Sequence, residues 1–366
     1  MGLVLGIDAR AAAEVPAGRG RYVRELLRAL VALPEAAGTR LELWARTPWR
    51  DPALDGDPRV SWRLVGLPDP LWHLAVAARA GGGAFLSTNS YLTAWATRIP
   101  TAVVVYDLVP FVAGAQAQSR AARIERATIR PALRRAAALP CISRATRDDL
   151  VARFPAAAPK ASVIPLAADA ALAAAPAPAL DPAHDLGGRP YVLAVGTLEP
   201  RKNLPRLIAA WTRLPEELRS AHALALVGPR GWDDEEVLAA ARAAGVRLLG
   251  RVGDAQLHAL YANATAFAYP SLYEGFGLPV LEAMAAGAPV LTSLSSSLPE
   301  VAGDAALLVD PRDTAAIAAG LERLLRDAGL RERLRVAGRA RAAAFSWERT
   351  ARETHALLAQ LASTRA

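Results

Sequence analysis

Two glutamates, Glu274 and Glu282, stand at the two ends of the segment EGFGLPVLE. A carboxylate repels a phosphate that it touches, so we expect this pair to accept hydrogen bonds from hydroxyl groups instead. Sugars and riboses supply such hydroxyls. The alternative is a structural turn in which Glu274 is solvated and Glu282 caps a helix. The pair predicts a site for a hydroxyl-rich ligand.

A strand, a loop, a short helix and a second strand must position these glutamates. Residues 264–270 and 288–292 are apolar runs typical of buried strands. Gly275 and Gly277 allow a tight turn between the two strands, Pro279 suits the first position of a helix, and Gly287 suits its left-handed end. In a parallel sheet such a helix starts at the carboxyl edge, where its unpaired N–H groups and its dipole favour an anion.

A pair of cations follows an earlier strand of the same half. Residues 191–195 are strand-like and lead into the string GTLEPRKN, in which Asn203 is expected to cap the next helix. A helix start carries only about half a positive charge, less than a diphosphate needs. We therefore expect Arg201 and Lys202 to bind phosphate, although a solvated basic pair is the plainer alternative. Lys202 is one of only two lysines in a chain that otherwise uses arginine, which favours a compact point charge there.

Alternating strands and helices predict an α/β fold with doubly wound parallel sheets in both halves. Residues 167–190 are rich in Ala, Pro and Gly and predict an exposed linker between the halves. Strands are expected at residues 3–7, 41–45, 60–65, 84–87, 101–105, 139–143, 162–166, 191–195, 223–227, 246–249, 266–269, 289–291 and 307–309, and helices at 22–33, 204–213, 315–325, 330–344 and from Ser346-Trp347 to about 361.

The composition describes a soluble globular protein large enough for two domains. The chain has 366 residues, of which 53% are hydrophobic and 21% charged. No apolar run approaches the ~20 residues of a membrane span, and the start, MGLVLGIDAR, lacks the basic lead and cleavage site of a signal peptide. We therefore expect a cytoplasmic protein, with a peripheral position on the inner face of the membrane as an alternative.

Metal-binding patterns are missing from the sequence. Cys141 is the only cysteine, and the five histidines are scattered without ligand spacing. One cysteine forms no intrachain disulfide, and there is no thiolate cluster to hold a metal. We expect a site without metal ligands and without a bound cofactor.

The net charge of +8 includes a basic stretch in the first half. Helical spacing puts four of its arginines on one face, namely Arg123, Arg126, Arg130 and Arg134. A solvated face is the plainer interpretation, and attraction to an anionic membrane or a phosphorylated acceptor is the alternative. Pro131 is expected to interrupt any continuous helix here. Nucleic-acid binding is disfavoured because no aromatic residues interleave with the arginines.

The strings EGFGLPVLE, GTLEPRKN and ISRATRDDLVARF resemble the retaining nucleotide-sugar glycosyltransferases of the GT-B type, in the large family numbered four. The resemblance implies two Rossmann-like domains facing each other across a cleft. Residues 1–170 would form the acceptor side and residues 185–340 the donor side, with a C-terminal helix in residues 345–366 returning to the first domain. The implied reaction transfers a hexose from a nucleoside diphosphate sugar with retention of configuration and without a metal.

The resemblance also implies roles for individual residues. Glu274 would orient the transferred sugar, Glu282 the ribose, and Arg201 and Lys202 the diphosphate; with Asp107 on the acceptor side, Glu274, Lys202 and Arg201 are the candidate catalytic residues. The remaining donor-binding candidates are Gly196, Thr197, Arg251, Val252, Gly275, Phe276, Gly277 and Leu278, and the acceptor-side candidates are Gly18, Gly20, Tyr106 and Asp107.

Tyr106 departs from the family, which often has histidine before this aspartate. A phenol can hydrogen-bond a sugar hydroxyl but does not titrate near neutral pH, so a proton-transfer role at this position is in doubt.

Among donors the pattern favours GDP-mannose, because it looks most like bacterial mannosyltransferases that build surface polysaccharide; UDP- and dTDP-sugars remain open. The expected acceptor is a saccharide or a lipid-linked saccharide. A nucleotide-sugar epimerase or hydrolase on the same architecture is an alternative that would turn over donor without acceptor. A non-catalytic sugar-nucleotide-binding protein is an alternative from a different class.

Overall fold

The computed structural model describes residues 2–15, 18–111, 120–173, 179–181, 186–231 and 234–364. It divides into one compact unit of residues 1–166 and 346–366 and a second of residues 167–345. Parts of the expected linker, residues 174–178 and 182–185, lie outside the described residues.

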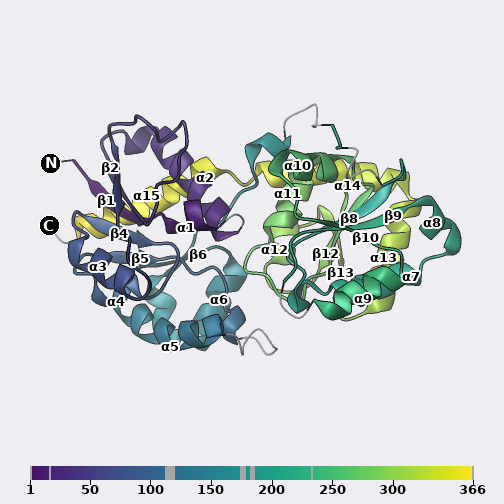
Figure 1. Ribbon diagram of the computed structural model, residues 1–366, viewed down its shortest axis with the longest axis horizontal. Helices are drawn as coiled ribbons and strands as arrows, with labels where there is room; N and C mark the ends of the chain where they lie inside the picture. Colours follow the sequence, from purple (N-terminus) through teal and green to yellow (C-terminus); the bar gives the residue numbers. More distant parts are fainter. Residues whose placement is uncertain are drawn as a thin grey trace. The chain divides into compact units, whose positions relative to one another are not determined.

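The first unit contains a five-stranded parallel sheet (Figure 1). The strand order is β3-β2-β1-β4-β5, and backbone bridges from the β5 region, Ala102 to Ala138 and Val105 to Cys141, continue it to the parallel pair β6-β7. The strands are β1 (Val4–Asp8), β2 (Arg40–Ala45), β3 (Val60–Leu64), β4 (Ala84–Ser87), β5 (Thr101–Val103), β6 (Leu139–Cys141) and β7 (Ala161–Val163).

The helices of this unit are α1 (Arg10–Glu14), α2 (Arg19–Ala32), α3 (Leu71–Arg79), α4 (Thr93–Ala96), α5 (Arg120–Arg135), α6 (Arg144–Arg153) and α15 (Trp347–Ser363), with short 3-10 turns at Pro34–Ala36, Val109–Phe111 and Pro155–Lys160. The prediction that Pro131 interrupts the basic stretch is wrong. α5 is one helix that contains Pro131.

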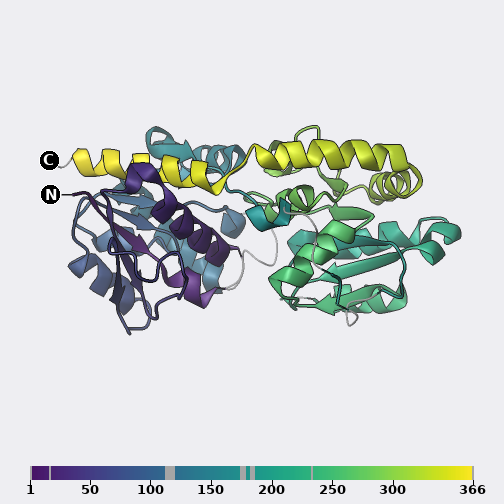
Figure 2. The ribbon, with the colours of Figure 1, turned by 90° about the horizontal axis from the view of Figure 1, so that it is seen from above.

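The last helix, α15, packs against α2 and β4 (Figure 2). Ser346 caps it by accepting a hydrogen bond from the backbone N–H of Arg349, and the rings of Tyr22 and Trp347 lie 6.2 Å apart. Thr350 donates its hydroxyl to the carbonyl oxygen of Pro165 at 2.7 Å. These contacts make α15 part of the first unit.

The second unit is a six-stranded parallel sheet in the order β10-β9-β8-β11-β12-β13. This order reverses direction between β8 and β11, as in a doubly wound nucleotide-binding fold. The strands are β8 (Tyr191–Val195), β9 (Ala223–Val227), β10 (Arg247–Gly250), β11 (Ala266–Tyr269), β12 (Val290–Ser293) and β13 (Ala306–Val309). The prediction of an α/β protein with two such domains is confirmed.

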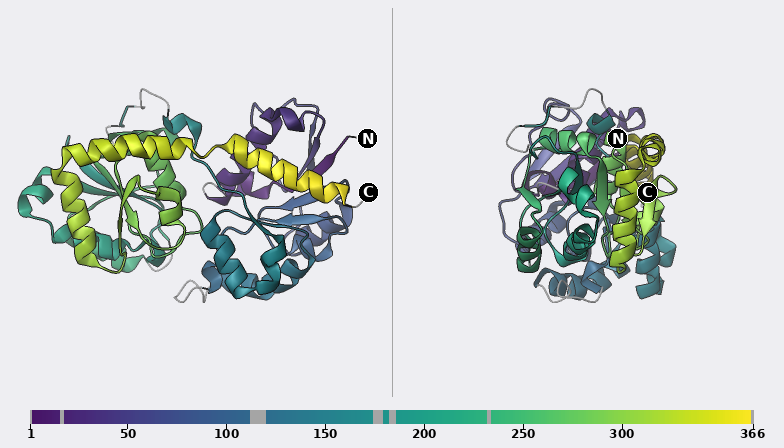
Figure 3. Two further views of the ribbon diagram at one scale, coloured as in Figure 1. Left: turned by 180° about the vertical axis from the view of Figure 1, so that it is seen from behind. Right: turned by 90° about the vertical axis from the view of Figure 1, so that its right-hand side faces the viewer.

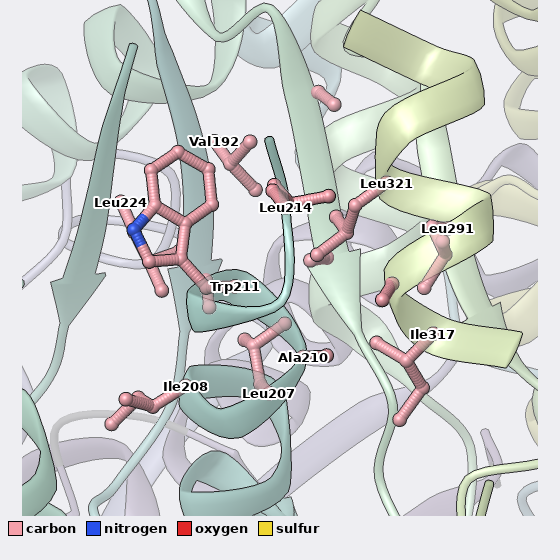
Figure 4. Close-up of a cluster of buried hydrophobic side chains, with 14 of the residues drawn as sticks. Val192, Leu207, Ile208, Ala210, Trp211, Leu214, Leu224, Leu291, Ile317 and Leu321 are labelled. Atoms are coloured by element: carbon pink, nitrogen blue, oxygen red, sulfur yellow. The ribbon is translucent and has the colours of Figure 1, made fainter. Parts of the chain in front are cut away.

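Helices cover this second sheet and bury an apolar cluster against it. Trp211 and Leu207 of α7 meet Val192 of β8 and Leu321 of α13 in that cluster (Figure 4). Figure 3 shows α13 and α14 in yellow-green outside the sheet, where α14 packs against α11 and α13 against α7. The helices are α7 (Leu204–Thr212), α8 (Glu216–Ala221), α9 (Glu235–Ala243), α10 (Asp254–Asn263), α11 (Leu278–Ala286), α12 (Leu298–Ala302), α13 (Thr314–Arg326) and α14 (Ala328–Ala343), with 3-10 turns at Ala170–Ala173 and Pro200–Lys202.

No helix in the described part of the chain combines the length and the apolar character that a membrane span requires.

Candidate active site

The carboxyl ends of β8 and β11 form the switch point of the second sheet. The two strands are hydrogen-bonded neighbours, and their following loops carry the two predicted motifs. Ligands of doubly wound folds bind in the crevice just outside the carboxyl ends of the strands, at such a switch point. The loop after β8 holds Arg201 and Lys202, and the loop after β11 holds Glu274.

The Glu274 carboxylate collects hydrogen bonds from both loops. Its Oε1 atom accepts from Lys202 Nζ at 2.7 Å, from the Tyr269 hydroxyl at 2.8 Å and from the Ser271 hydroxyl at 2.7 Å. Its Oε2 atom accepts from Arg201 Nη1 at 2.5 Å. Among the described residues Oε2 accepts this single hydrogen bond, so it has room for a further hydroxyl.

The charges of this cluster hold one another in the ionised state. Glu274 and Lys202 are 7% and 8% exposed. Burial by itself raises the pKa of the Glu274 carboxyl, but Arg201 and Lys202 outweigh burial and lower that pKa to about 2. Burial lowers the pKa of the Lys202 ammonium, and Glu274 opposes this shift. Glu274 is therefore an anion at neutral pH.

Arg201 is oriented by two acidic residues. Its Nη1 donates to Glu274 and to the carbonyl oxygen of Tyr273 at 3.2 Å, and its Nε lies 2.6 Å from Glu199 Oε1. The contact with Glu199 is an ion pair without the angle of a hydrogen bond. Among the described residues, Arg201 Nη2 has no hydrogen-bond partner, so this amino group is available to a ligand.

The expectation that Asn203 caps α7 with its side chain is wrong. Asn203 precedes the helix in a left-handed conformation, φ 59°, and makes no side-chain capping bond. Its Nδ2 instead donates to the carbonyl oxygens of Pro270 at 2.9 Å and Pro311 at 2.6 Å. Asn203 thus fastens the loop after β8 to the loops after β11 and β13.

The loop before α11 is held by two serines. Ser297 donates its hydroxyl to the carbonyl oxygens of Glu274 at 2.9 Å and Phe276 at 2.8 Å, and Ser296 accepts from the Glu274 backbone N–H at 2.8 Å. Gly277 takes φ 102° where the loop enters the helix. The Phe276 ring is buried edge-on against another phenylalanine, so only its backbone can serve a ligand.

Glu282 lies in α11 and is 5% exposed. Its Oε2 accepts from the buried Tyr261 hydroxyl at 3.1 Å. This bond fixes the carboxylate on the side of α11 that faces α10.

The other donor-side candidates lie along the same sheet edge. Gly196 and Thr197 follow β8 directly, and a Cβ atom at Gly196 would lie 3.3 Å from the Lys202 side chain. Leu278 begins α11, and Gly275 precedes Phe276 in the loop. Arg251 is exposed and Val252 is half-buried in the loop after β10, the outermost strand.

A pocket of about 560 Å³ occupies the corresponding switch point of the first unit, where loops leave β1, β4 and β5. Its lining includes the predicted acceptor-side residues Tyr106 and Asp107, together with Arg10, Arg19, Asp69, Pro70, His73, Thr88, Asn89, Ser90, Tyr91, Leu92, Val104, Ile124, Glu125 and Thr128.

The charged side chains of this pocket fall into two groups. Arg10 is buried and forms a bidentate pair with Asp8, at 3.1 and 2.9 Å, so it holds the loop after β1 in place. Arg19 and Glu125 make no hydrogen bond or ion pair in the described part of the chain. Burial raises the pKa of Glu125 to about 7, against the pull of Arg19. These two groups are free to meet a ligand.

The predicted acceptor-side residues differ in what they present. Asp107 is half-buried and accepts the Val109 backbone N–H at 3.0 Å. Tyr106 lines the pocket, but its hydroxyl is buried and has no hydrogen-bond partner among the described residues. Gly18, with φ 54°, precedes α2. A Cβ atom at Gly20 would lie 1.7 Å from the Val15 carbonyl oxygen, so this glycine is required by packing.

Sequence reasoning missed five residues that the fold brings to these two places: Arg19, Glu125, Glu199, Tyr269 and Ser271. Arg19 stands between the two predicted glycines, and Glu199 stands inside the predicted phosphate string. Their positions in these motifs were the available signal. Nothing in the local sequence marked Glu125, because it belongs to the basic stretch of α5.

No group of three or more His, Cys, Asp or Glu side chains that could hold a metal ion occurs among the described residues.

The second unit is similar to a known family, and the whole chain is similar to solved structures. Residues 179–341 match the family model described as glycosyl transferases group 1. A sucrose-phosphate synthase from Thermosynechococcus elongatus superimposes with a TM-score of 0.75 at 23% identity, covering 99% of this chain and 100% of that chain. HepE from Anabaena, solved with UDP and glucose, gives 0.73 at 18% identity, covering 98% and 100%. The chain has the GT-B fold.

Two relatives that are similar in sequence are both mannosyltransferases by name. O-antigen chain mannosyltransferase B of Escherichia coli is 46% identical over 175 residues, which are 47% of this chain and 46% of the relative. MMP alpha-(1->4)-mannosyltransferase of Mycolicibacterium hassiacum is 32% identical over 222 residues, 59% of this chain and 52% of the relative. The chain spans about half the length of these relatives. The predicted resemblance to GT-B glycosyltransferases similar to bacterial mannosyltransferases is confirmed.

Proposed function

We propose that the protein is a retaining, metal-independent glycosyltransferase. It transfers a hexose from a nucleoside diphosphate sugar to a saccharide or lipid-linked acceptor in the synthesis of a surface polysaccharide. The observation that carries the proposal is the cluster of Arg201, Lys202 and Glu274 at the switch point of the second sheet, beside the start of α11.

The donor-side chemistry follows from that cluster. Glycosyl transfer needs stabilisation of an oxocarbenium-like sugar and of the departing diphosphate. Arg201 Nη2 and the Lys202 ammonium supply positive charge to the diphosphate as its bond to the sugar breaks. Glu274 accepts a hydroxyl of the transferred sugar at its remaining Oε2 position, and Glu282 accepts the ribose hydroxyls.

The acceptor is assigned to the pocket of the first unit. Asp107 and Glu125 offer oxygens to acceptor hydroxyls, and Arg19 offers a guanidinium that lies over the Tyr106 ring, 5.1 Å from its centroid. The donor is assigned to GDP-mannose because several relatives in sequence are mannosyltransferases by name.

A nucleotide panel tests the donor assignment. The protein is melted with GDP, UDP and dTDP and with their mannose or glucose conjugates. A ligand at 100 times its dissociation constant adds about 2.7 kcal/mol of stability. We expect the largest shift with the guanosine compounds. A larger shift with UDP or dTDP compounds contradicts GDP-mannose as donor, and no shift with any of them contradicts the donor site.

Product analysis separates the alternatives. A transferase releases nucleoside diphosphate faster when an acceptor oligosaccharide is present and forms an α-linked product from an α-linked donor. Acceptor-independent release of free sugar identifies a hydrolase, and formation of an epimeric sugar nucleotide identifies an epimerase. Binding without turnover identifies a non-catalytic partner.

We also propose that the exposed face of α5 attracts the first unit to anionic membranes. Arg123, Arg130 and Arg134 are exposed there, next to Ile124 at 48% exposure. Arg126 instead turns back to the carbonyl oxygen of Pro110 at 2.9 Å. Co-sedimentation with vesicles containing phosphatidylglycerol is expected to weaken with salt as the screening length falls to about 8 Å and below. If binding is unaffected by salt and by Arg-to-Gln changes at these three positions, the membrane proposal is wrong. The arginines then form a solvated face only.

A further inference from the structure

Glu199 is an acidic residue inside the basic phosphate loop. It immediately precedes the 3-10 turn Pro200–Lys202 and is 7% exposed. Its Oε1 lies 2.6 Å from Arg201 Nε, so this carboxylate contacts the same guanidinium that carries the Nη2 group. A buried carboxylate beside a residue that is proposed to bind phosphate opposes that binding. Its presence in this loop therefore needs a functional explanation.

The cluster contains as many anions as cations. Arg201 and Lys202 carry two positive charges, and Glu199 and Glu274 carry two negative ones. Glu274 is committed to both cations, whereas Glu199 contacts Arg201 alone. A diphosphate therefore meets a cluster whose formal charges cancel, although the side chains that would donate to it, Arg201 and Lys202, are cationic.

We propose that Glu199 is a counter-ion of Arg201 that limits how tightly the site holds the nucleoside diphosphate. The inference rests on the proposed function, because it assigns the ligand of Arg201. The negative charge of Glu199 offsets one of the two cations that the diphosphate meets. The released nucleoside diphosphate is the product, so a neutral cluster allows it to leave.

The charge and the shape of Glu199 can be separated by mutation. Glu199→Gln retains the side-chain volume and removes one like charge from beside the diphosphate. Because like charges at this range repel strongly in a site partly shielded from water, we expect the dissociation constant of the nucleoside diphosphate to fall roughly threefold to tenfold. If release of the nucleoside diphosphate limits the rate, turnover is expected to fall as well.

The matched control is Glu216→Gln. Glu216 is an exposed residue of α8 that pairs with Arg219, so this variant loses the same charge and also an arginine pair, but outside the cluster. Isothermal titration with GDP, UDP and dTDP is carried out on the full-length wild type, on Glu199→Gln and on the control. Glu199→Ser gives a second neutral variant, and thermal melting checks that each is folded.

Tighter binding by the two Glu199 variants, with the control at the wild-type value, supports the proposal. If the wild type binds the nucleoside diphosphate and the folded Glu199 variants bind it equally well or more weakly, the counter-ion proposal is wrong. The proposed donor site is then unaffected. Failure of all three diphosphates to bind the wild type overturns the donor site and this inference together.

Discussion

Lys202 Nζ lies 2.7 Å from Glu274 Oε1, although 72 positions separate the two residues in the chain. The pairing of β8 with β11 brings their loops together, and Tyr269 at the end of β11 bonds to both groups. This ion pair joins the two predicted motifs into one site, and the predictions below test what each part contributes.

Lys202→Ala should weaken nucleoside diphosphate binding and lower turnover on the order of 10²-fold, because the lost charge opposes a diphosphate most strongly as it departs. Tyr269→Phe is the control, since it removes a hydroxyl from the same cluster without removing a charge. Calorimetry and steady-state kinetics measure the two effects. Normal binding in folded Lys202→Ala contradicts a phosphate contact.

Glu282→Ala should lower donor affinity by about 1 to 3 kcal/mol, because ribose hydroxyls lose their acceptor. The same change removes an acceptor of the buried Tyr261 hydroxyl, so Tyr261→Phe serves as a control that removes this hydroxyl and keeps the Glu282 carboxylate. We expect Tyr261→Phe to bind the diphosphate nearly as wild type does. Equal losses in the two variants would assign Glu282 a structural role only.

Asp107→Asn should raise the Michaelis constant of the acceptor or lower turnover and leave nucleotide binding unchanged. Asp107 lines the pocket of the first unit, whereas the phosphate and ribose groups belong to the second. Nucleotide titration of the folded variant, with acceptor kinetics, measures both quantities. Loss of nucleotide binding contradicts this division of labour.

Glu125 should make stability depend on pH. Its folded pKa of about 7 exceeds its ordinary value of 4.5 because the carboxyl is buried. The folded state then binds more protons, so stability is retained below about pH 4.5 and falls as pH rises toward 7 and beyond, by at most about 3 kcal/mol. Urea melts at pH 5 and pH 8 measure this loss. Glu125→Gln should reduce it, and an identical pH dependence in the variant contradicts the assignment.

A chelator should leave turnover largely intact, since Arg201 and Lys202 supply the charge that a divalent cation provides elsewhere. Initial rates with and without EDTA test this, with the donor and acceptor held constant. Loss of activity that Mg²⁺ or Mn²⁺ restores would refute metal independence.

The sequence by itself determined the α/β class, most strand positions and the two motifs of the second unit. Strands buried on both faces are continuous apolar runs, and turn residues such as Gly277 and Gly287 mark where helices begin and end. The structure has φ 102° and 86° at these two glycines. Such features depend on a few neighbouring residues, so they can be predicted locally.

Local rules failed where a distant partner decided the outcome. Asn203 has the right type to cap a helix, yet its Nδ2 donates to Pro270 and Pro311 and its Oδ1 accepts from Arg206 instead of a helix N–H. Pro131 has the wrong type for a helix, yet α5 continues through it, with Ile129 and Leu133 buried in the core of the first unit. In both cases tertiary contacts outweighed a local preference.

Only the tertiary structure decided the chemistry of the charged groups. Glu274 is a committed ion-pair partner because parallel strand pairing places it beside Arg201 and Lys202, and Glu125 has a raised pKa because α5 buries it beside the first switch point. Electrostatic energy depends on separation in space and on exposure to water. Neither quantity can be read from positions along the chain.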